Sequence, residues 1–423
     1  MVLTTLGSLG DLYPVLSLAR ALENRGIEAR LALSPDDCEV ARKWGLLATP
    51  VTPSEAEVSA ALGMTRDEIA ASILRDPSPL LSRMAIPMLP DLVPRLLDLC
   101  DGAACVTGTT FALGAPIAAE RAGLPFVPLV LQPMLTFAPE DPPQARGFGL
   151  AVQRPGTRFG LAWNGMMLAV MRMVLRGRHG RELTKIRASL GLPAQPGTPL
   201  IDFGGEVPMR LALWSEHFSP VPSSAHAFRT VGFPPAPEGA LPDQVRTWLR
   251  AGPPPLVVTL GSIAQGLGGA RFWSEAVTMA RNMGLRVVLL HGTAAVPDGP
   301  DVLALPYAAH APLFPEAAAI VHHGGIGTTA EALRSGRPQL VVPVGGDQPD
   351  NAARLERLGV AVTLPIKQFR GHKATRSLTG LLDRFDYARA ADLGETLWQE
   401  DGAALAARLL EEVVVARNAS RPR

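Results

Sequence analysis

The residues best suited to chemistry lie between positions 320 and 355, in the stretch IVHHGGIGTTAEALRSGRPQLVVPVGGDQPDNAARL. An apolar run ends there in two histidines, and several glycines then let the backbone come close to a ligand before Thr328 opens a helix. Free backbone N–H groups and the positive end of the dipole favour an anion at the start of a helix. The combination of His323, Gly325, Gly327 and Thr328 therefore predicts a pyrophosphate site. A glycine-rich turn with purely structural histidines is the alternative.

Alternating strands and helices in the first half would position one side of such a site. The chain opens with a strand, VLTTLG, a helix over about 15–26 and a second strand, IEARLALS, which is a β-α-β unit. The rhythm recurs at GAACVTG, at a small-residue helix over 112–122 and at PFVPLVL. A long loop over 133–160, a helix over about 161–190 and a last strand at LALWSE complete this half.

A proline-dense stretch over 218–252 separates this half from a second one and is typical of an interdomain linker. After it, strands alternate with helices again, as in LVVTLG, LRVVLLHG, AAIVHHG and PQLVVPV. We therefore predict an N-terminal domain at 1–217, a C-terminal domain at 253–385, and a closing helix and tail at 386–423 that pack back on the N-terminal domain. Two Rossmann-like, doubly wound α/β domains would face each other across a cleft, with ligands at the carboxyl ends of their strands.

The stretch from 320 to 355 resembles the donor-binding motif of the family 1 glycosyltransferases, which combine two such domains in the GT-B fold. Its positions follow His323 without a gap and are filled by Gly325, Thr328, Glu331, Gly336, Pro338, Pro343, Asp347, Gln348 and Asn351. The resemblance implies that His323 and Thr328 hold the donor diphosphate and that Asp347 and Gln348 bind sugar hydroxyls. A carboxylate beside an amide can form several such hydrogen bonds, although an ordinary polar loop after a strand would show the same pair. The layout of the whole chain resembles the bacterial rhamnosyltransferase and sterol glucosyltransferase branch.

The resemblance weakens upstream, where the nucleoside would bind. Plant members of the family carry a tryptophan that stacks on the base and a glutamine three residues later, and LALPYAAHAPLFP has neither. Tyr307 is the candidate to replace that stacking, and both UDP and dTDP sugars remain open as donors. Ser262, at the end of LVVTLGS, matches a family position whose serine approaches the phosphates. The sequence has no Asp-x-Asp motif that would hold a metal between phosphates, so neither a metal nor another cofactor is predicted.

The first strand–helix turn reads GSLGDLYP at 7–14. In the family this turn faces the donor and carries the catalytic base, as Gly-His-x-x-Pro or Gly-Asp-x-x-Pro. The resemblance therefore implies that Asp11 takes the proton from an acceptor hydroxyl as this attacks the anomeric carbon, which is then inverted. A carboxylate with a pKa of about 4 is a weak base, and a closed cleft would raise that pKa. The alternative is that Asp11 only caps the helix that follows.

Acceptor sites in this family belong to the N-terminal domain. Phe111, Met134, Phe137 and Met166 are predicted to line an apolar acceptor pocket, because methionines adapt to irregular ligands. A plain core helix would explain the methionines over 166–173 equally well. Arginines flank this helix, which is consistent with docking on anionic lipid, although an ordinary solvated face carries such charges more often.

Composition argues against several other classes of protein. Forty basic residues balance 39 acidic ones, so no general attraction to nucleic acid is expected. The three cysteines, Cys38, Cys100 and Cys105, have no metal-ligand spacing and no disulfide framework, which suits a reducing cytoplasm. No signal peptide is recognised, and no apolar run reaches the ~18 residues of a membrane span. We expect a cytoplasmic protein that could also contact the inner face of the membrane.

Together these features predict an inverting, metal-independent glycosyltransferase that moves glucose or rhamnose from a UDP or dTDP sugar. Its acceptor would be a hydroxyl of a small hydrophobic molecule: a lipid, a terpenoid or sterol, or a flavonoid-type aglycone. Two alternatives share the fold, namely a catalytically silent partner that activates another transferase and a nucleotide-sugar epimerase. Silent partners commonly lose groups such as Asp11 and His323, which are intact here. An NAD-dependent oxidoreductase is disfavoured, because the first turn lacks a Gly-x-Gly-x-x-Gly run.

Overall fold

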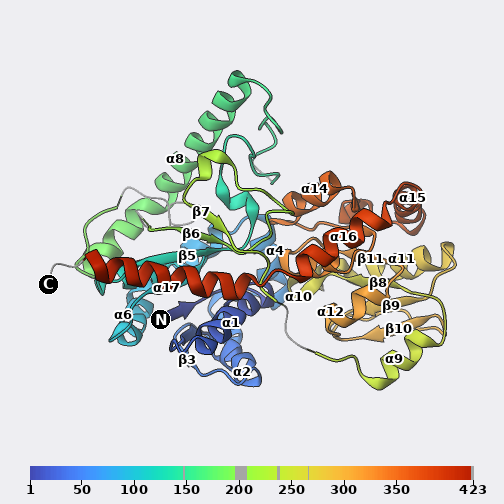
Figure 1. Cartoon of the computed structure of the whole chain (residues 1–423), viewed down its shortest axis with the longest axis horizontal. Coiled ribbons are helices and arrows are strands. Elements are labelled where there is room, and N and C mark those ends of the chain that lie inside the picture. Colours follow the sequence, from blue (N-terminus) through green and yellow to red (C-terminus); the bar gives the residue numbers. More distant parts are fainter. Residues whose placement is uncertain (146–147, 196–206, 236–238, 265, 421–423) are drawn as a thin grey trace.

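A computed structural model describes residues 1–145, 148–195, 207–235, 239–264 and 266–420. Two parallel sheets, each accompanied by helices, form two domains that lie side by side in Figure 1. The first domain is drawn mainly in blue to green and the second in yellow to orange. This arrangement confirms the predicted pair of doubly wound α/β domains.

The N-terminal sheet has seven parallel strands in the order β3-β2-β1-β4-β5-β6-β7. Strands β1, β4 and β5 are buried along their whole length, as expected where helices cover both faces of a parallel sheet. The strand order reverses between β1 and β4, and the first turn of α1, which carries Asp11, follows β1 at this switch point. The strands are β1 (Val2–Thr4), β2 (Arg30–Leu33), β3 (Ala48–Pro50), β4 (Val106–Thr109), β5 (Phe126–Val130), β6 (Arg210–Ala212) and β7 (Phe228–Thr230).

The C-terminal sheet has six parallel strands in the order β10-β9-β8-β11-β12-β13. Its switch point lies between β8 and β11, whose last residues, Thr259 and His322, are partners in register. The turns after these two strands carry Ser262 and His323, so the register itself brings these residues together. The strands are β8 (Leu256–Thr259), β9 (Val287–Leu290), β10 (Val302–Leu305), β11 (Ala319–His322), β12 (Gln339–Val341) and β13 (Ala361–Thr363).

Helices connect the strands, and none of the described ones is long and apolar enough to cross a bilayer. Those of the first half are α1 (Leu9–Asn24), α2 (Pro35–Lys43), α3 (Glu55–Leu62), α4 (Arg66–Arg75), α5 (Ser78–Leu80), α6 (Leu89–Cys100), α7 (Gly114–Arg121) and α8 (Arg158–Ser189). Those of the second half are α9 (Asp243–Arg250), α10 (Gly261–Ala264), α11 (Gly269–Asn282), α12 (His310–Leu313), α13 (Ile326–Arg334), α14 (Gln348–Leu358), α15 (Gly371–Leu382), α16 (Tyr387–Trp398) and α17 (Gly402–Ser420).

The stretch over 218–252, predicted as a linker, contains regular structure. Strand β7 pairs in parallel with β6 and extends the N-terminal sheet. Helix α9 packs through Val245 and Leu249 on the C-terminal domain, in a cluster that includes Val257 of β8. Pro242 stands immediately before α9, where the missing backbone N–H costs nothing. The prolines therefore lie around these elements and do not replace them.

The end of the chain runs back across both domains. Helix α16 packs on α13, and the indole N–H of Trp398 donates to the carbonyl of Arg334 at 3.1 Å. Helix α17, drawn in red in Figure 1, lies along the N-terminal domain and packs on α1. Arg25 and Glu411 form an ion pair between these two helices.

Candidate active site

A cavity of about 1430 Å³ lies between the two domains. The turns after β1, β4 and β5 line it from the N-terminal domain, and those after β8, β10, β11 and β12 line it from the C-terminal domain. It therefore occupies the switch points of both sheets, where doubly wound folds bind ligands. The predicted site residues that line it are Asp11, Phe111, Met134, Phe137, Ser262, Tyr307, His323, Gly325, Gly327, Thr328, Asp347 and Gln348.

The imidazole of His323 is held between two glycine backbones. A β-carbon at Gly261 would lie 2.3 Å from the ring, and a β-carbon at Gly325 would lie 2.3 Å from Nε2. The side chain is only 4% exposed, and this burial lowers its pKa to about 3, so the ring is neutral at pH 7. Its Nδ1 has no hydrogen-bond partner among the described residues. The ring is therefore fixed and neutral where His323 lines the cavity, whereas its unpaired Nδ1 is itself enclosed by protein.

The start of α13 faces the same cavity. Its N-cap residue, Gly325, offers no side chain to the free backbone N–H groups. Ile326, Gly327 and Thr328 form the first turn and line the cavity. Because free N–H groups at a helix start bind phosphate, α13 and His323 together supply an anion-binding surface. This geometry supports the predicted pyrophosphate site.

His322, the first of the two histidines, is part of the scaffold. Its Nδ1 accepts the backbone N–H of Gly324 at 3.3 Å, which leaves the ring proton on Nε2. That Nε2 lies 3.0 Å from Oε1 of Gln339 in the neighbouring strand and donates to it. The side chain is completely buried. His322 therefore fixes the turn that carries His323 and is not exposed to a ligand.

The amide of Gln348 is partly occupied by the protein itself. Its Oε1 accepts the backbone N–H groups of Val344 and Gly345 at 2.7 and 3.2 Å. These bonds fix the turn that leads into α14. The amide oxygen of Gln348 is therefore already used by the protein, and only its amide nitrogen is left to bind a sugar hydroxyl, as a donor. The sequence implies that both atoms of the amide are available.

Asp347 is the N-cap residue of α14 and is held by Asn351 one turn later. Nδ2 of Asn351 donates to Oδ2 of Asp347 at 2.8 Å and to the carbonyl of Gly324 at 2.9 Å. Burial raises the pKa of Asp347 to about 7, and the negative charge of Asp11 contributes to this shift. Near neutral pH the carboxyl group can therefore both accept hydrogen bonds from a sugar and donate them to it.

Asp11 lies in the first turn of α1 and caps that helix. The backbone N–H and the hydroxyl of Ser8 donate to its Oδ2 at 2.8 and 3.1 Å, which completes a capping box. Both bonds use Oδ2, so Oδ1 is the oxygen available to an acceptor hydroxyl in the cavity. Burial raises the pKa of Asp11 to about 6 despite these hydrogen bonds, which makes it a stronger base than an exposed carboxylate. From the sequence, helix capping and proton abstraction are alternative roles for Asp11, but the geometry of its side chain is compatible with both.

Helix α4 of the N-terminal domain reaches the loop between β12 and α14 of the other domain. The carbonyl of Leu74, in the last turn of α4, accepts the backbone N–H of Gly346 at 2.7 Å. A β-carbon at Gly345 would lie 2.2 Å from this carbonyl oxygen, so the contact requires glycine there. The two domains therefore touch directly beside Asp347. No motif in the sequence indicates this contact.

Aromatic residues line the part of the cavity next to β10. Tyr307 follows β10 and interacts with Tyr13 of α1 across the cleft. Burial and this interaction raise the pKa of Tyr13 to about 12. His310 stacks on Phe314 with ring centroids 4.5 Å apart. The exposed face of Tyr307 remains the candidate surface for the base, as the sequence predicts.

Glu331 is a cavity residue to which the motif alone assigns no role. Its Oε1 pairs with Nη1 of Arg334 at 2.5 Å, whereas its Oε2 has no hydrogen-bond partner among the described residues. This oxygen is enclosed by protein, so a ligand hydroxyl would reach it only after the neighbouring side chains move. Spacing is the signal that could have found it, since Glu331 lies three residues after Thr328 on the same face of α13.

Apolar side chains of the N-terminal domain surround the other end of the cavity. Phe111 follows β4, and Met134 and Phe137 follow β5. The ring of Phe137 packs on Phe148 with centroids 6.4 Å apart. These residues form an apolar wall on the same side of the cavity as Asp11, which suits an acceptor with a hydrophobic body.

The prediction for Met166 is wrong. Its side chain is 50% exposed and does not line the cavity. Met171 and Leu175 of the same helix line it instead, and Leu168 packs on Phe137. Met166 lies five residues before Met171, which is about 140° away around an α-helix. The sequence shows apolar residues on both sides of α8 and could not indicate which side faces inwards.

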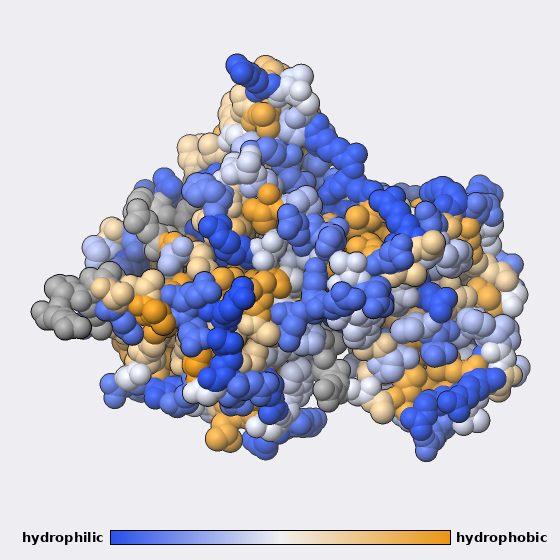
Figure 2. All heavy atoms as spheres, viewed as in Figure 1, coloured by the Kyte–Doolittle hydropathy of each residue, from blue (hydrophilic) through white to orange (hydrophobic). Residues whose placement is uncertain are grey.

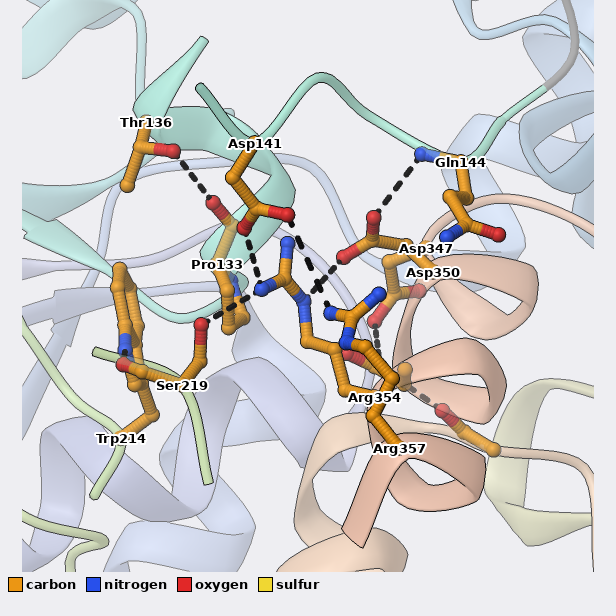
Figure 3. A network of polar contacts seen from close by, with 12 residues as sticks. Pro133, Thr136, Asp141, Gln144, Trp214, Ser219, Asp347, Asp350, Arg354 and Arg357 are labelled. Carbon is orange, nitrogen blue, oxygen red and sulfur yellow. Dashed lines mark hydrogen bonds and ion pairs between the residues drawn. The ribbon is translucent and has the colours of Figure 1, made fainter. Parts of the chain in front are cut away.

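Charged residues join the two domains beside the cavity (Figure 3). Arg354 of α14 donates Nε to Asp350 at 2.7 Å, and its Nη1 lies 2.6 Å from both Asp141 and Ser219. The backbone N–H of Gln144 donates to Asp350 at 2.9 Å. The side chains of Asp350 and Arg354 are each only 2% exposed. This network ties α14, whose N-cap residue is Asp347, to the loop that follows Phe137.

Comparisons with known proteins agree with this geometry. Residues 285–403 match the family described as the erythromycin biosynthesis protein CIII-like C-terminal domain. The chain is 30% identical to the vancomycin aglycone glucosyltransferase of Amycolatopsis orientalis, over 98% of this chain and 97% of the relative. The chain belongs to the family 1 glycosyltransferases. As a member, it is a nucleotide-sugar-dependent enzyme.

Solved structures show the same fold for this glycosyltransferase. The glycotransferase of kitacinnamycin superposes with a TM-score of 0.73 at 19% identity, over 97% of this chain and 98% of that structure. The glycosyltransferase VinC in complex with dTDP superposes with a TM-score of 0.67 at 22% identity, over 98% and 99% of the two chains. The predicted GT-B fold is thereby confirmed.

Proposed function

We propose that this enzyme moves glucose or rhamnose from a dTDP or UDP sugar to a hydroxyl of a hydrophobic natural-product aglycone, with inversion and without a metal. The observation that carries the proposal is that Asp11 of one domain and His323 and Asp347 of the other line the same cavity. One domain offers a base beside an apolar wall. The other offers groups for a diphosphate and a sugar.

The relatives favour this choice of substrates. The vancomycin aglycone glucosyltransferase is named for a glucose donor and an aglycone, and VinC was solved with dTDP. The cavity volume of about 1430 Å³ exceeds the ~300–1,000 Å³ of most small-molecule pockets. This volume suits a nucleotide sugar together with a bulky acceptor.

In the proposed reaction, Oδ1 of Asp11 takes the proton of the acceptor hydroxyl as its oxygen attacks the anomeric carbon of the sugar. The new glycosidic bond forms while the bond from that carbon to the diphosphate oxygen breaks. Attack from the side opposite the leaving group inverts the anomeric centre. The N–H groups at the start of α13, together with His323, stabilise the negative charge that develops on the nucleoside diphosphate.

Calorimetric titration with UDP, dTDP, UDP-glucose and dTDP-rhamnose tests the donor site, first in EDTA and then with magnesium. We expect tight binding of one diphosphate in EDTA, unchanged by magnesium. Turnover is then measured with the matching sugar and a panel of aglycones, with the anomeric configuration of the product read by NMR.

Each outcome separates the alternatives. Binding of no nucleotide would overturn the proposed donor site. Nucleotide-sugar binding with transfer only in the presence of a second protein would indicate a silent partner. Conversion of the nucleotide sugar without any acceptor would indicate an epimerase. Retention of anomeric configuration, or a strict need for magnesium, would overturn the proposed mechanism.

A further inference from the structure

The outer face of α8 is unusually apolar. Among the described residues, twelve large hydrophobic side chains are exposed, and seven of these lie between positions 150 and 174. Helices on the surface of globular domains normally turn polar residues outwards, and concentrated apolar exposure marks an interaction site. The seven residues are Leu150, Val152, Phe159, Met166, Val170, Met173 and Val174.

Helical spacing gathers four of these side chains into one stripe. Phe159, Met166, Val170 and Met173 follow one another at intervals of seven, four and three residues, so they share one side of α8. Phe159 is 79% exposed and Met173 is 64% exposed. The opposite side of the helix is buried through residues such as Leu168. We call these four residues the outer stripe.

Basic residues flank the outer stripe on both sides. At 100° per residue, Arg158 and Arg176 fall on one side of it. Arg178, which also pairs with Asp76, falls on the other side just beyond Met173, and Lys185 lies further along that side. All four are exposed. Helix α8 carries seven basic residues and a single acidic one, Glu182, and only Arg187 of the seven is buried, where it pairs with Glu120. The surface is therefore apolar along its centre and positively charged along its edges.

The position of α8 leaves this surface accessible. The amino-terminal part of the helix projects from the body of the N-terminal domain (Figure 1). Figure 2 shows hydrophobic and hydrophilic surface close together on this projection. A projecting element can meet a flat, extended surface without a clash from the rest of the protein.

We propose that the outer stripe docks on a membrane surface that contains anionic phospholipids. Its apolar side chains would enter the boundary between headgroups and acyl chains, and the flanking basic residues would pair with lipid phosphates. Met171 and Leu175 on the inner side of α8 line the acceptor end of the cavity. Docking would therefore bring that end close to lipid, from which a hydrophobic acceptor could enter. This last link rests on the proposed function, whereas docking itself does not.

Flotation with vesicles tests the proposal. The full chain is mixed with vesicles of phosphatidylcholine alone or of phosphatidylcholine and phosphatidylglycerol in equal parts, without any nucleotide sugar. We expect binding to the mixed vesicles that weakens as salt is raised. Phe159→Ser with Met173→Ser should lower the partition coefficient by roughly tenfold or more. Arg158→Gln with Arg176→Gln should lower it by a similar factor, and only for the anionic vesicles.

A matched pair controls for the loss of exposed apolar surface. Leu47→Ser with Val415→Ser removes two exposed apolar side chains outside α8 and should leave vesicle binding unchanged. Circular dichroism and nucleotide binding show whether each variant is folded, independently of the lipid. Absence of wild-type binding to mixed vesicles, or equal loss in the control pair, would overturn the proposal. A dimer that becomes monomeric in the stripe variants would instead identify the stripe as a subunit interface, and would overturn it too.

Discussion

Nδ2 of Asn351 lies 2.8 Å from Oδ2 of Asp347, and the same nitrogen donates to the carbonyl of Gly324 at 2.9 Å. One buried amide therefore links the turn after β11, which carries His323, to the carboxylate at the start of α14. This side chain holds the turn that carries His323 and the carboxylate of Asp347 at a fixed separation. Asn351 is a positioning residue and does not line the cavity itself.

Substitution Asn351→Ala should impair use of the sugar donor more than it impairs folding. Hydrogen bonds to charged groups are worth about 1.5–3 kcal/mol, so kcat/KM for the nucleotide sugar should fall about tenfold to a hundredfold. Steady-state kinetics over a range of donor concentrations measures the effect, and thermal unfolding checks the fold. Unchanged donor kinetics in a folded variant would contradict the role assigned to Asn351.

Substitution Gly325→Ala should displace the ring of His323, because the new β-carbon would lie 2.3 Å from Nε2. The backbone of Gly325 has a φ of −63°, which alanine adopts freely, so the effect would be steric and not conformational. We expect nucleoside diphosphate affinity to fall at least about tenfold, as for a lost hydrogen bond to a charged group. Calorimetric titration with dTDP and UDP measures it.

Gly380→Ala is the matched control for this substitution. Gly380 lies in α15 of the same domain, and a β-carbon there would meet nothing within 4 Å. Its diphosphate affinity should equal that of the wild type. Equal diphosphate affinities for the wild type, Gly325→Ala and Gly380→Ala would show that the close packing of His323 between glycines does not matter for binding.

The pH dependence of turnover should report the raised pKa of Asp11. Its pKa is about 6, and the base must be ionised to take a proton, so kcat/KM should fall about tenfold per pH unit below that value and level off above it. The raised pKa makes activity rise with pH but makes the stability of the fold decrease with pH, because burial favours the protonated form of Asp11. Ionisation of Asp11 should therefore lower the stability of the fold as pH rises from about 4 through about 6.

Asp11→Asn separates these two effects. Asparagine can still accept the N–H of Ser8 and cap α1, so the variant should remain folded while turnover falls by roughly 10²–10⁴. Its residual activity should lose the acidic limb of the pH profile. Asp347→Asn, in contrast, should keep that limb, because the base is still present. A limb near pH 6 that survives in Asp11→Asn would assign the titration to another group.

The Arg354 network should contribute to stability and to the closed arrangement of the domains. Arg354→Met would leave the carboxylate of Asp350 buried without its cation, which typically costs about 3–5 kcal/mol. Asp141→Asn should cost no more than about 1 kcal/mol, because Asp141 is partly exposed. Denaturant unfolding measures both, and small-angle scattering should show a larger radius of gyration for Arg354→Met. Equal unfolding midpoints for the two variants would contradict this difference.

The sequence by itself determined the features that depend on local order along the chain. Strands such as β1 and β11 are apolar runs that end in chemically distinctive turns, and parallel β-α-β order brings those turns to one edge of each sheet. The continuous motif from His323 to Asn351 therefore sufficed to predict a donor site in the second domain. The capping position of Asp11 is equally local, since it depends on Ser8 three residues earlier.

Only the tertiary structure decided which side of an element faces inwards and what meets across the cleft. Helix α8 is apolar on both sides, so its periodicity could not tell the buried Leu168 from the exposed Met166. The contact of Leu74 with Gly346 joins residues 272 positions apart and has no local signature. The raised pKa values of Asp11 and Asp347 likewise arise because parts of the chain far apart in the sequence pack around them and reduce their hydration. The burial of a side chain depends on tertiary packing, so a local stretch of sequence does not determine it.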